Sequence, residues 1–173
     1  MDLNFITRAI DGFSETLGRI VAWFSVLVVL LTASIVIMRY GFNLGSIALQ
    51  ETVLYLHSAV FLLGAGYTLK HNEHVRVDVL YSHFSAEKKH WVNLLGGLFL
   101  LMPLYIFILI VSWGFVLDSW DILESSSDAG GLPLVYILKS LIPLFALSFL
   151  FQGVSEMLKA LVGILQSRKE EVK

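Results

Sequence analysis

The sequence lacks cysteine altogether and carries few charges for its length. Of its 173 residues only 15% are charged, while 57% are hydrophobic; soluble domains typically carry about 25% charged residues. The missing cysteine excludes disulfides, thiolate metal ligands and a cysteine nucleophile. With a net charge of −2, the chain lacks the excess of positive charge that indicates nucleic-acid binding. So much apolar surface fits a lipid bilayer, and we expect a single membrane domain over residues 1–173.

Four apolar segments are long enough to cross a bilayer, which requires about 20 residues in a helix. Three of them, 20–38, 52–69 and 91–117, contain no charged residue, and the fourth, 132–155, is interrupted only by Lys139. Pro103 and Pro143 lie inside the third and fourth segments, where packed membrane helices tolerate a kink. We predict an all-α integral membrane fold with four transmembrane helices. The predicted spans cover about residues 20–39, 50–70, 88–118 and 132–158.

The segment before the first span has the pattern of an amphipathic helix. Its apolar residues recur at steps of three and four, which places them on one helical face, and most of its polar residues lie on the other. We predict an interfacial helix over residues 2–17, lying on the membrane surface. The alternative is a helix that packs on a partner or on this chain's own loops. The apolar face consists of Leu3, Ile6, Ile10, Phe13 and Leu17.

The basic residues predict the orientation, because they concentrate on the cytoplasmic side of membrane proteins. Ten of the twelve lysines and arginines precede the first span, follow the fourth or lie between the second and third. We therefore expect both termini and the loop 71–87 to be cytoplasmic. The outward loop 118–131 is acidic and has no basic residue. The ten basic residues are Arg8, Arg19, Lys70, Arg76, Lys88, Lys89, Lys159, Arg168, Lys169 and Lys173.

The histidines give little support for haem or a metal ion. Only His57 lies inside one of the charge-free segments, so a bis-histidine haem pair between helices is not expected. His57 is interpreted as a polar contact between helices. The other histidines match no compact metal motif. In the cytoplasmic loop, the alternation from His74 to Asp78 predicts an extended strand-like segment. Ser85 is a natural cap for the helix that leads into the third span.

Two charged residues flank the short outer hairpin between the first and second spans. Arg39 ends the first span and Glu51 opens the second, so each charge favours the dipole at its own helix end. We expect the two to pair across the hairpin, and direct substrate contact is the alternative. A small drug exporter would instead need a buried carboxylate in the first span, and that span has no ionisable residue.

Lys139 is the one charged residue inside an apolar span. It lies roughly 10 Å deep in the fourth span at 1.5 Å per residue. Three interpretations stay open: its long side chain extends outward to the interface, it pairs with Glu124 or another acid of the outward loop, or it binds a substrate anion.

Several of these features together resemble one family. Arg39-Tyr40-Gly41-Phe42 closes the first span and Glu51 opens the second, and His74-Val75-Arg76-Val77-Asp78 is the most specific piece. The sequence, from about residue 21 to 159, resembles the DctQ-like small membrane subunit of tripartite ATP-independent periplasmic (TRAP) transporters. It departs from many relatives at the mouth of the second span, where only one acid of a pair remains. Further matching pieces are Gly64 to Lys70, Glu124-Ser125, Gly130 to Pro133, Lys139 and Gln152-Gly153.

The resemblance implies a function that the residues alone do not give. A periplasmic binding protein would deliver an organic anion, of the carboxylate type, to a membrane pair in the bacterial inner membrane. The large, DctM-like subunit would hold the substrate and sodium sites and move them. The present chain would be its static scaffold, with no enzyme activity and no cofactor of its own. The alternative is an anchor or assembly subunit of another inner-membrane complex, such as a redox enzyme. Structural or partner roles would fall to Arg39, Glu51, His74, Arg76, Asp78, Glu124, Lys139 and Gln152.

Overall fold

The computed structural model describes residues 3–74 and 81–171. All regular structure in these two stretches is helical, and four helices there are long and apolar enough to cross a membrane, as the sequence predicts. The helix named α4 leads through a π-helical turn, η1, directly into α5. The elements are α1 (Leu3–Gly41), α2 (Ile47–Lys70), α4 (Ala86–Gly96), η1 (Gly97–Leu101), α5 (Met102–Asp121) and α6 (Val135–Glu171).

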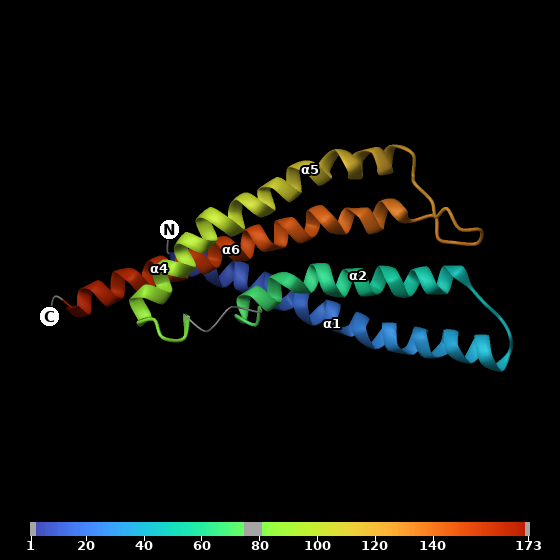
Figure 1. The fold of residues 1–173 in the computed structure, drawn as a ribbon, viewed down its shortest axis with the longest axis horizontal. Coiled ribbons are helices and arrows are strands. Elements are labelled where there is room, and N and C mark those ends of the chain that lie inside the picture. The colour runs from blue at the N-terminus through green and yellow to red at the C-terminus, as the bar shows by residue number, and fades with distance from the viewer. Residues whose placement is uncertain (1–2, 75–80, 172–173) are drawn as a thin grey trace.

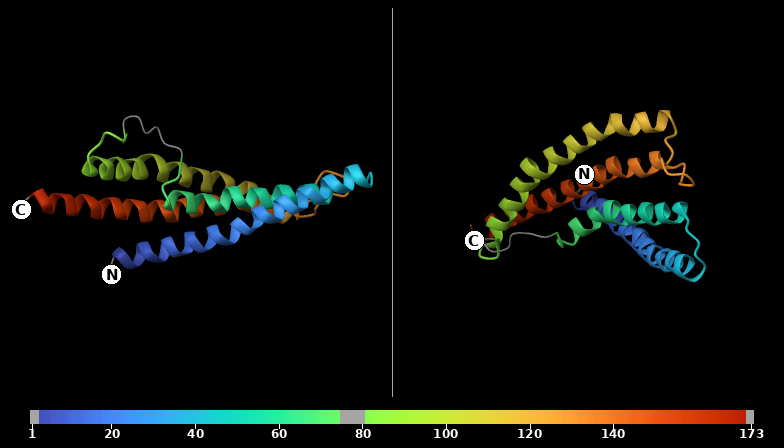
Figure 2. Two further views of the ribbon diagram at one scale, coloured as in Figure 1. Left: turned by 90° about the horizontal axis from the view of Figure 1, so that it is seen from below. Right: turned by 45° about the vertical axis from the view of Figure 1, so that its right-hand side comes forward.

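The helices form an open row, in the order α5, α6, α2 and α1 (Figure 1). The first and last described residues lie toward one end of this row, which we call the terminal end. The α1–α2 and α5–α6 connections lie at the other, the hairpin end. α1 crosses the row: near its start it lies beside α6, and farther along it follows α2 (Figure 2). α6 is the central element, because α1, α2, α4 and α5 all pack on it.

α1 shows where the predicted interfacial helix lies. It is one continuous helix of 39 residues, about 58 Å long at 1.5 Å per residue, whereas the hydrocarbon core is about 30 Å thick. The expected separate helix over residues 2–17 is therefore the first part of α1. Ser14 is buried on the side that faces the other helices, while Phe5 and Phe13 are exposed. This segment packs on helices of its own chain through its polar face, a contact that neither of the two interpretations predicts, and its position at the membrane surface stays a prediction.

Local sequence signals explain the ends and the irregularity of the third span. Ser85 caps α4 by accepting a hydrogen bond from the backbone N–H of Lys88 at 3.4 Å, as predicted. Pro103 has no N–H to donate to the preceding turn. Just before it, the N–H of Met102 bonds to the carbonyl of Gly97, five residues back, and the helix widens into η1. α6 continues through Pro143.

The interior of the row is thin and unusually polar. In the described chain, the largest side chains that are less than 2% exposed are Gln152, Ser119 and Ser155. Aromatic rings fill the α5–α6 contact, where Tyr105 stacks on Phe149 with ring centroids 4.2 Å apart. Most large apolar side chains of α1 and α5 point outward, as membrane helices require. Apolar side chains gain no hydrophobic energy by leaving lipid for protein, so the helices are held together by close packing and by polar contacts between them.

Candidate functional site: two polar clamps

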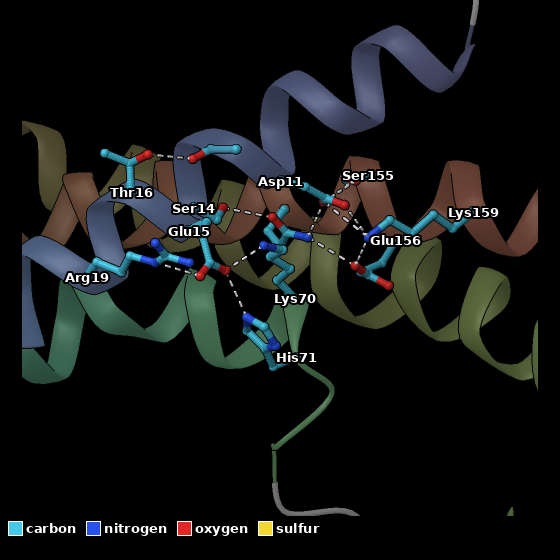
Figure 3. Close-up of polar contacts among 12 residues, drawn as sticks. Asp11, Ser14, Glu15, Thr16, Arg19, Lys70, His71, Ser155, Glu156 and Lys159 are labelled. Atoms are coloured by element: carbon cyan, nitrogen blue, oxygen red, sulfur yellow. Dashed lines mark hydrogen bonds and ion pairs between the residues drawn. The ribbon is translucent and has the colours of Figure 1, made fainter.

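Gln152 is fully buried and lies at the centre of a hydrogen-bond network between α1 and α6. Figure 3 shows its partners Ser14, Asp11 and Glu156. Its side-chain oxygen accepts a bond from Ser14 Oγ at 2.7 Å. Its amide nitrogen donates to Asp11 Oδ1 and to Glu156 Oε1, each at 3.0 Å. Both N–H donors of the amide are thus used, which removes the cost of burying a polar group without partners. One side chain of α6 thereby fixes the first part of α1.

Asp11 joins the same network with a negative charge. It accepts a hydrogen bond from Ser155 Oγ at 2.8 Å and forms an ion pair with Lys159, with Oδ2 2.8 Å from Nζ. Lys159 also pairs with Glu156 of its own helix at 2.7 Å. A charge in a largely apolar region is tolerated when it is paired and hydrogen-bonded, and Asp11 meets both conditions.

Glu15 connects α1 to the end of α2, one turn farther along. Its carboxylate lies 2.6 Å from Lys70 Nζ, 3.0 Å from His71 Nε2 and 2.9 Å from Arg19 Nε. Gly18 follows, and a methyl group there would collide with the ring of Tyr67, so only glycine permits this close crossing. We call this cluster the terminal clamp: Asp11, Ser14, Glu15, Lys70, Gln152, Ser155, Glu156 and Lys159.

A second set of contacts fixes the loop at the hairpin end. Glu51, in the first turn of α2, accepts hydrogen bonds from Ser126 Oγ and from the backbone N–H of Leu132. A side chain on Gly131 would collide with Ser126 and Glu51, so glycine is needed for the loop to approach. The backbone of Ser126 also bonds to the carbonyl of Leu132 at 3.0 Å. Glu51 therefore holds the α5–α6 loop against α2 through these hydrogen bonds.

Lys139 of α6 pairs with Glu124 of this loop, which is the second of the three interpretations given above. Its Nζ also lies 4.0 Å from the ring centroid of Phe115 on α5. The ion pair holds the pKa of the Glu124 carboxyl below its usual value. We call this cluster the hairpin clamp: Glu51, Glu124, Ser126, Leu132 and Lys139.

The expected ion pair between Arg39 and Glu51 does not form, although both residues are described. Glu51 is occupied by Ser126 and Leu132, and Arg39 is exposed at the end of α1. The reason is that the loop after α5 folds back over α2 and supplies donors that are nearer. The predicted pair spans the short hairpin between α1 and α2. In the structure, Glu51 instead bonds to Ser126 and Leu132 of the longer loop between α5 and α6.

The remaining predicted residues are dispersed. His74 follows α2, with its ring 5.3 Å from that of Phe149. Arg76 and Asp78 lie outside the described residues, and so does most of the predicted extended segment. His57, expected between helices, is instead exposed on the outside of α2. Of the glycines within the helices, Gly66 faces Ser148 of α6, whereas Gly96 and Gly114 face open space.

Sequence analysis identified Gln152 but missed most of its partners. The spacing of Asp11, Ser14 and Glu15 indicates that they lie on the polar side of the first helical segment, but it does not indicate what covers that side. The sequence of the last helix does indicate a polar contact between helices. Gln152, Ser155 and Glu156 place three polar side chains on neighbouring turns of an apolar helix, and such residues normally face protein.

A cavity of about 710 Å³ adjoins the terminal clamp. It lies between α6 and the α4–η1–α5 helix, with Glu156 and Asn93 among its polar lining residues and Leu101, Tyr105 and Phe149 among its apolar ones. Among the residues that the structure describes, no three histidine, aspartate or glutamate side chains gather into a set that could hold a metal ion. The chemistry of both clamps is mutual neutralisation: each charged group is bound to another group of the chain.

Comparison with known proteins gives one result. The family model described as "Tripartite ATP-independent periplasmic transporters, DctQ component" matches residues 27–163. The match includes the whole hairpin clamp and the α2 and α6 parts of the terminal clamp, and it begins after Asp11, Ser14 and Glu15. No curated protein and no solved structure matches the sequence.

Proposed function

The chain belongs to the DctQ family of tripartite ATP-independent periplasmic transporters, and on this premise we propose that it is the static small membrane subunit of such a transporter. Its task is to give a large membrane subunit a fixed neighbour while that subunit moves the substrate. The observation that carries the proposal is the pair of clamps. α1, α2 and α6 are joined by a buried hydrogen bond and by partly buried ion pairs at one end, and the loop is joined to α2 and α6 at the other.

The distribution of charge supports a frame rather than a pathway. An ion route through a membrane protein requires polar groups at mid-membrane depth, facing the protein interior or water. Here the paired charges gather toward the two ends of the row, and the middle of the α5–α6 contact is aromatic. We therefore assign the sodium sites and the anion site, of the carboxylate type, to the large subunit. No catalytic step is assigned to this chain.

The proposed setting is the inner membrane, with the terminal end in the cytoplasm. Lys70, Lys88, Lys89 and Lys159 lie toward that end, whereas Asp118, Asp121, Glu124 and Asp128 lie toward the hairpin end. The orientation can be measured directly because the chain has no cysteine. Ser127→Cys in the loop should react with a membrane-impermeant maleimide from the periplasmic side, and Ser82→Cys should react only after the membrane is opened.

Reconstitution tests the function. Vesicles containing this chain, the large subunit and the periplasmic binding protein should take up a carboxylate when a sodium gradient is applied. Uptake should be lost when any one component is omitted. Transport by this chain alone would overturn the proposal. The redox alternative predicts a haem absorption band in the purified protein, whereas the transporter predicts a colourless subunit that co-purifies with a larger membrane protein.

A further inference from the structure

His57 is placed where a membrane helix normally has no imidazole. It lies on α2 about 15 Å from the start of the helix and about 20 Å from its end, at 1.5 Å per residue. This is near the middle of a hydrocarbon core about 30 Å thick. The side chain is exposed, and no hydrogen bond or ion pair joins it to any residue of the described chain. Polar groups at this depth almost always face protein or a water-filled cavity.

His57 belongs to a continuous outer stripe. Leu54 and Phe61, three residues before it and four after, are 52% and 73% exposed, and that spacing places all three on one face of α2. Gln50 adds a second exposed polar group nearer the hairpin end. Both α1 and α6 pack on the remainder of α2. We call this face the α2 stripe: Ile47, Gln50, Leu54, His57 and Phe61.

The exposed faces of the other long helices differ in chemistry. On α6 the exposed stripe is wholly apolar and consists of Ile137, Leu144, Phe151, Val154, Leu161 and Leu165. On α1 the exposed Thr32 and Ser34 donate to carbonyls of their own helix, at 2.7 and 2.8 Å, so they need no outside partner. Ser25 is exposed as well, but it carries a single small hydroxyl in place of an imidazole. His57 has no such bond. It is therefore the group for which contact with lipid is least favourable.

We propose that the α2 stripe is the surface on which the large membrane subunit docks, with His57 hydrogen-bonded to a polar group of one of its helices. The inference rests on the proposed function and adds the surface to it. A second copy of this chain fits the stripe poorly. Close pairing of identical helices favours small residues, but the stripe is bulky, and Gly66, the buried glycine of α2, already faces Ser148 of α6.

Photocrosslinking in the assembled complex tests the surface. A benzophenone amino acid replaces Phe61 in one variant and Phe151 in the other. The two sites are matched, since both are exposed phenylalanines at comparable depth, 73% and 53% exposed. Illumination should join the Phe61 variant to the large subunit and leave the Phe151 variant without that adduct. An adduct from Phe151 alone, or a Phe61 adduct made of two copies of this chain, would overturn the inference.

Substitution of His57 tests the hydrogen bond. His57→Leu should weaken assembly with the large subunit about three- to fifteenfold, the range expected for one hydrogen bond between membrane helices, and His57→Gln should restore most of it. Thr32→Leu is the control, because Thr32 is an exposed polar residue whose bond is internal; it should leave assembly unchanged. If His57→Leu assembles as well as the unmodified chain, the proposed bond does not exist.

Failure of the inference is distinguishable from failure of the proposed function. Before any substitution, the unmodified chain must co-purify with the large subunit. If it does not, the proposed function fails. If it does, and the crosslinks come from α6 or α1, only the docking surface is wrong and the scaffold role stands.

Discussion

The terminal clamp joins helix to helix, whereas the hairpin clamp joins a loop to helices. In the terminal clamp, Gln152 and Ser155 are fully buried, and their partners come from α1 and α6, which are far apart in the sequence. In the hairpin clamp, Glu51 and Lys139 are only half-buried, and one donor is a backbone N–H. The difference indicates two roles: the terminal clamp determines where α1 crosses α6, and the hairpin clamp determines the shape of the outer loop.

The largest effect should follow from breaking the terminal clamp at its centre. Gln152→Leu leaves Ser14 and Asp11 each without one buried partner, which costs about 1–3 kcal/mol of unfolding free energy. Because these contacts fix the crossing, the first part of α1 should also become sensitive to protease. Unfolding in mixed micelles measures the first effect and limited proteolysis the second. Phe151→Leu, at the adjacent exposed position, is the control, and equal stability of the two variants would contradict the role assigned to Gln152.

A smaller and more local effect is expected at the hairpin clamp. Glu51→Gln keeps the size of the side chain but removes its negative charge, so the charge-assisted hydrogen bonds from Ser126 and Leu132 are replaced by weaker neutral ones. Hydrogen exchange of the loop amides should become faster, while the amides of α1 should exchange as before.

Arg39→Gln is the matched control for this experiment. Arg39 does not pair with Glu51 in the structure, so its substitution should leave exchange in the loop unchanged. If Arg39→Gln accelerated exchange in the loop as much as Glu51→Gln does, Arg39 and Glu51 would have to be paired. The contacts of Glu51 with Ser126 and Leu132 would then be wrong.

The smallest effect concerns pH. The ion pair with Lys139 lowers the pKa of Glu124 below its ordinary value of 4.5. The stabilisation is therefore complete above pH 4.5 and is lost as the pH falls through the lowered pKa. A spin label on Ser127→Cys should stay restricted at neutral pH and become more mobile only below pH 4.5. In a Glu124→Gln background the label should already be more mobile at neutral pH, because the ion pair is absent, and its further change below pH 4.5 should be smaller, since only the contacts of Glu51 remain. A transition near neutral pH in the chain that keeps Glu124 would contradict the assignment.

The contacts of the two clamps are less predictable from the sequence than the helices that carry them. The four spans, the Ser85 cap and the family were predictable, because apolar length, capping chemistry and motif order are local properties of the chain. The sequence does not decide among the three interpretations of Lys139, and the predicted pairing of Glu51 with Arg39 is wrong. Both depend on how the loop between α5 and α6 folds back, and no local pattern encodes that path.

The first segment of the chain shows the same limit most clearly. A polar face beside an apolar face predicts an amphipathic helix, and α1 is helical there. The sequence cannot say whether water or protein covers the polar face. The structure places it against α6 and α2, where Asp11 and Ser14 bond to the buried Gln152 and Glu15 pairs with the half-buried Lys70.

The sequence by itself determined that this chain is a four-helix membrane protein of the DctQ family, since hydrophobic length and motif order act over short distances. Only the tertiary structure decided which polar groups neutralise one another and which are left for a partner. Gln152 and His57 are both polar residues within apolar helices. The packing of α1 across α6 buries the first, and the same packing leaves the second on the outside of α2.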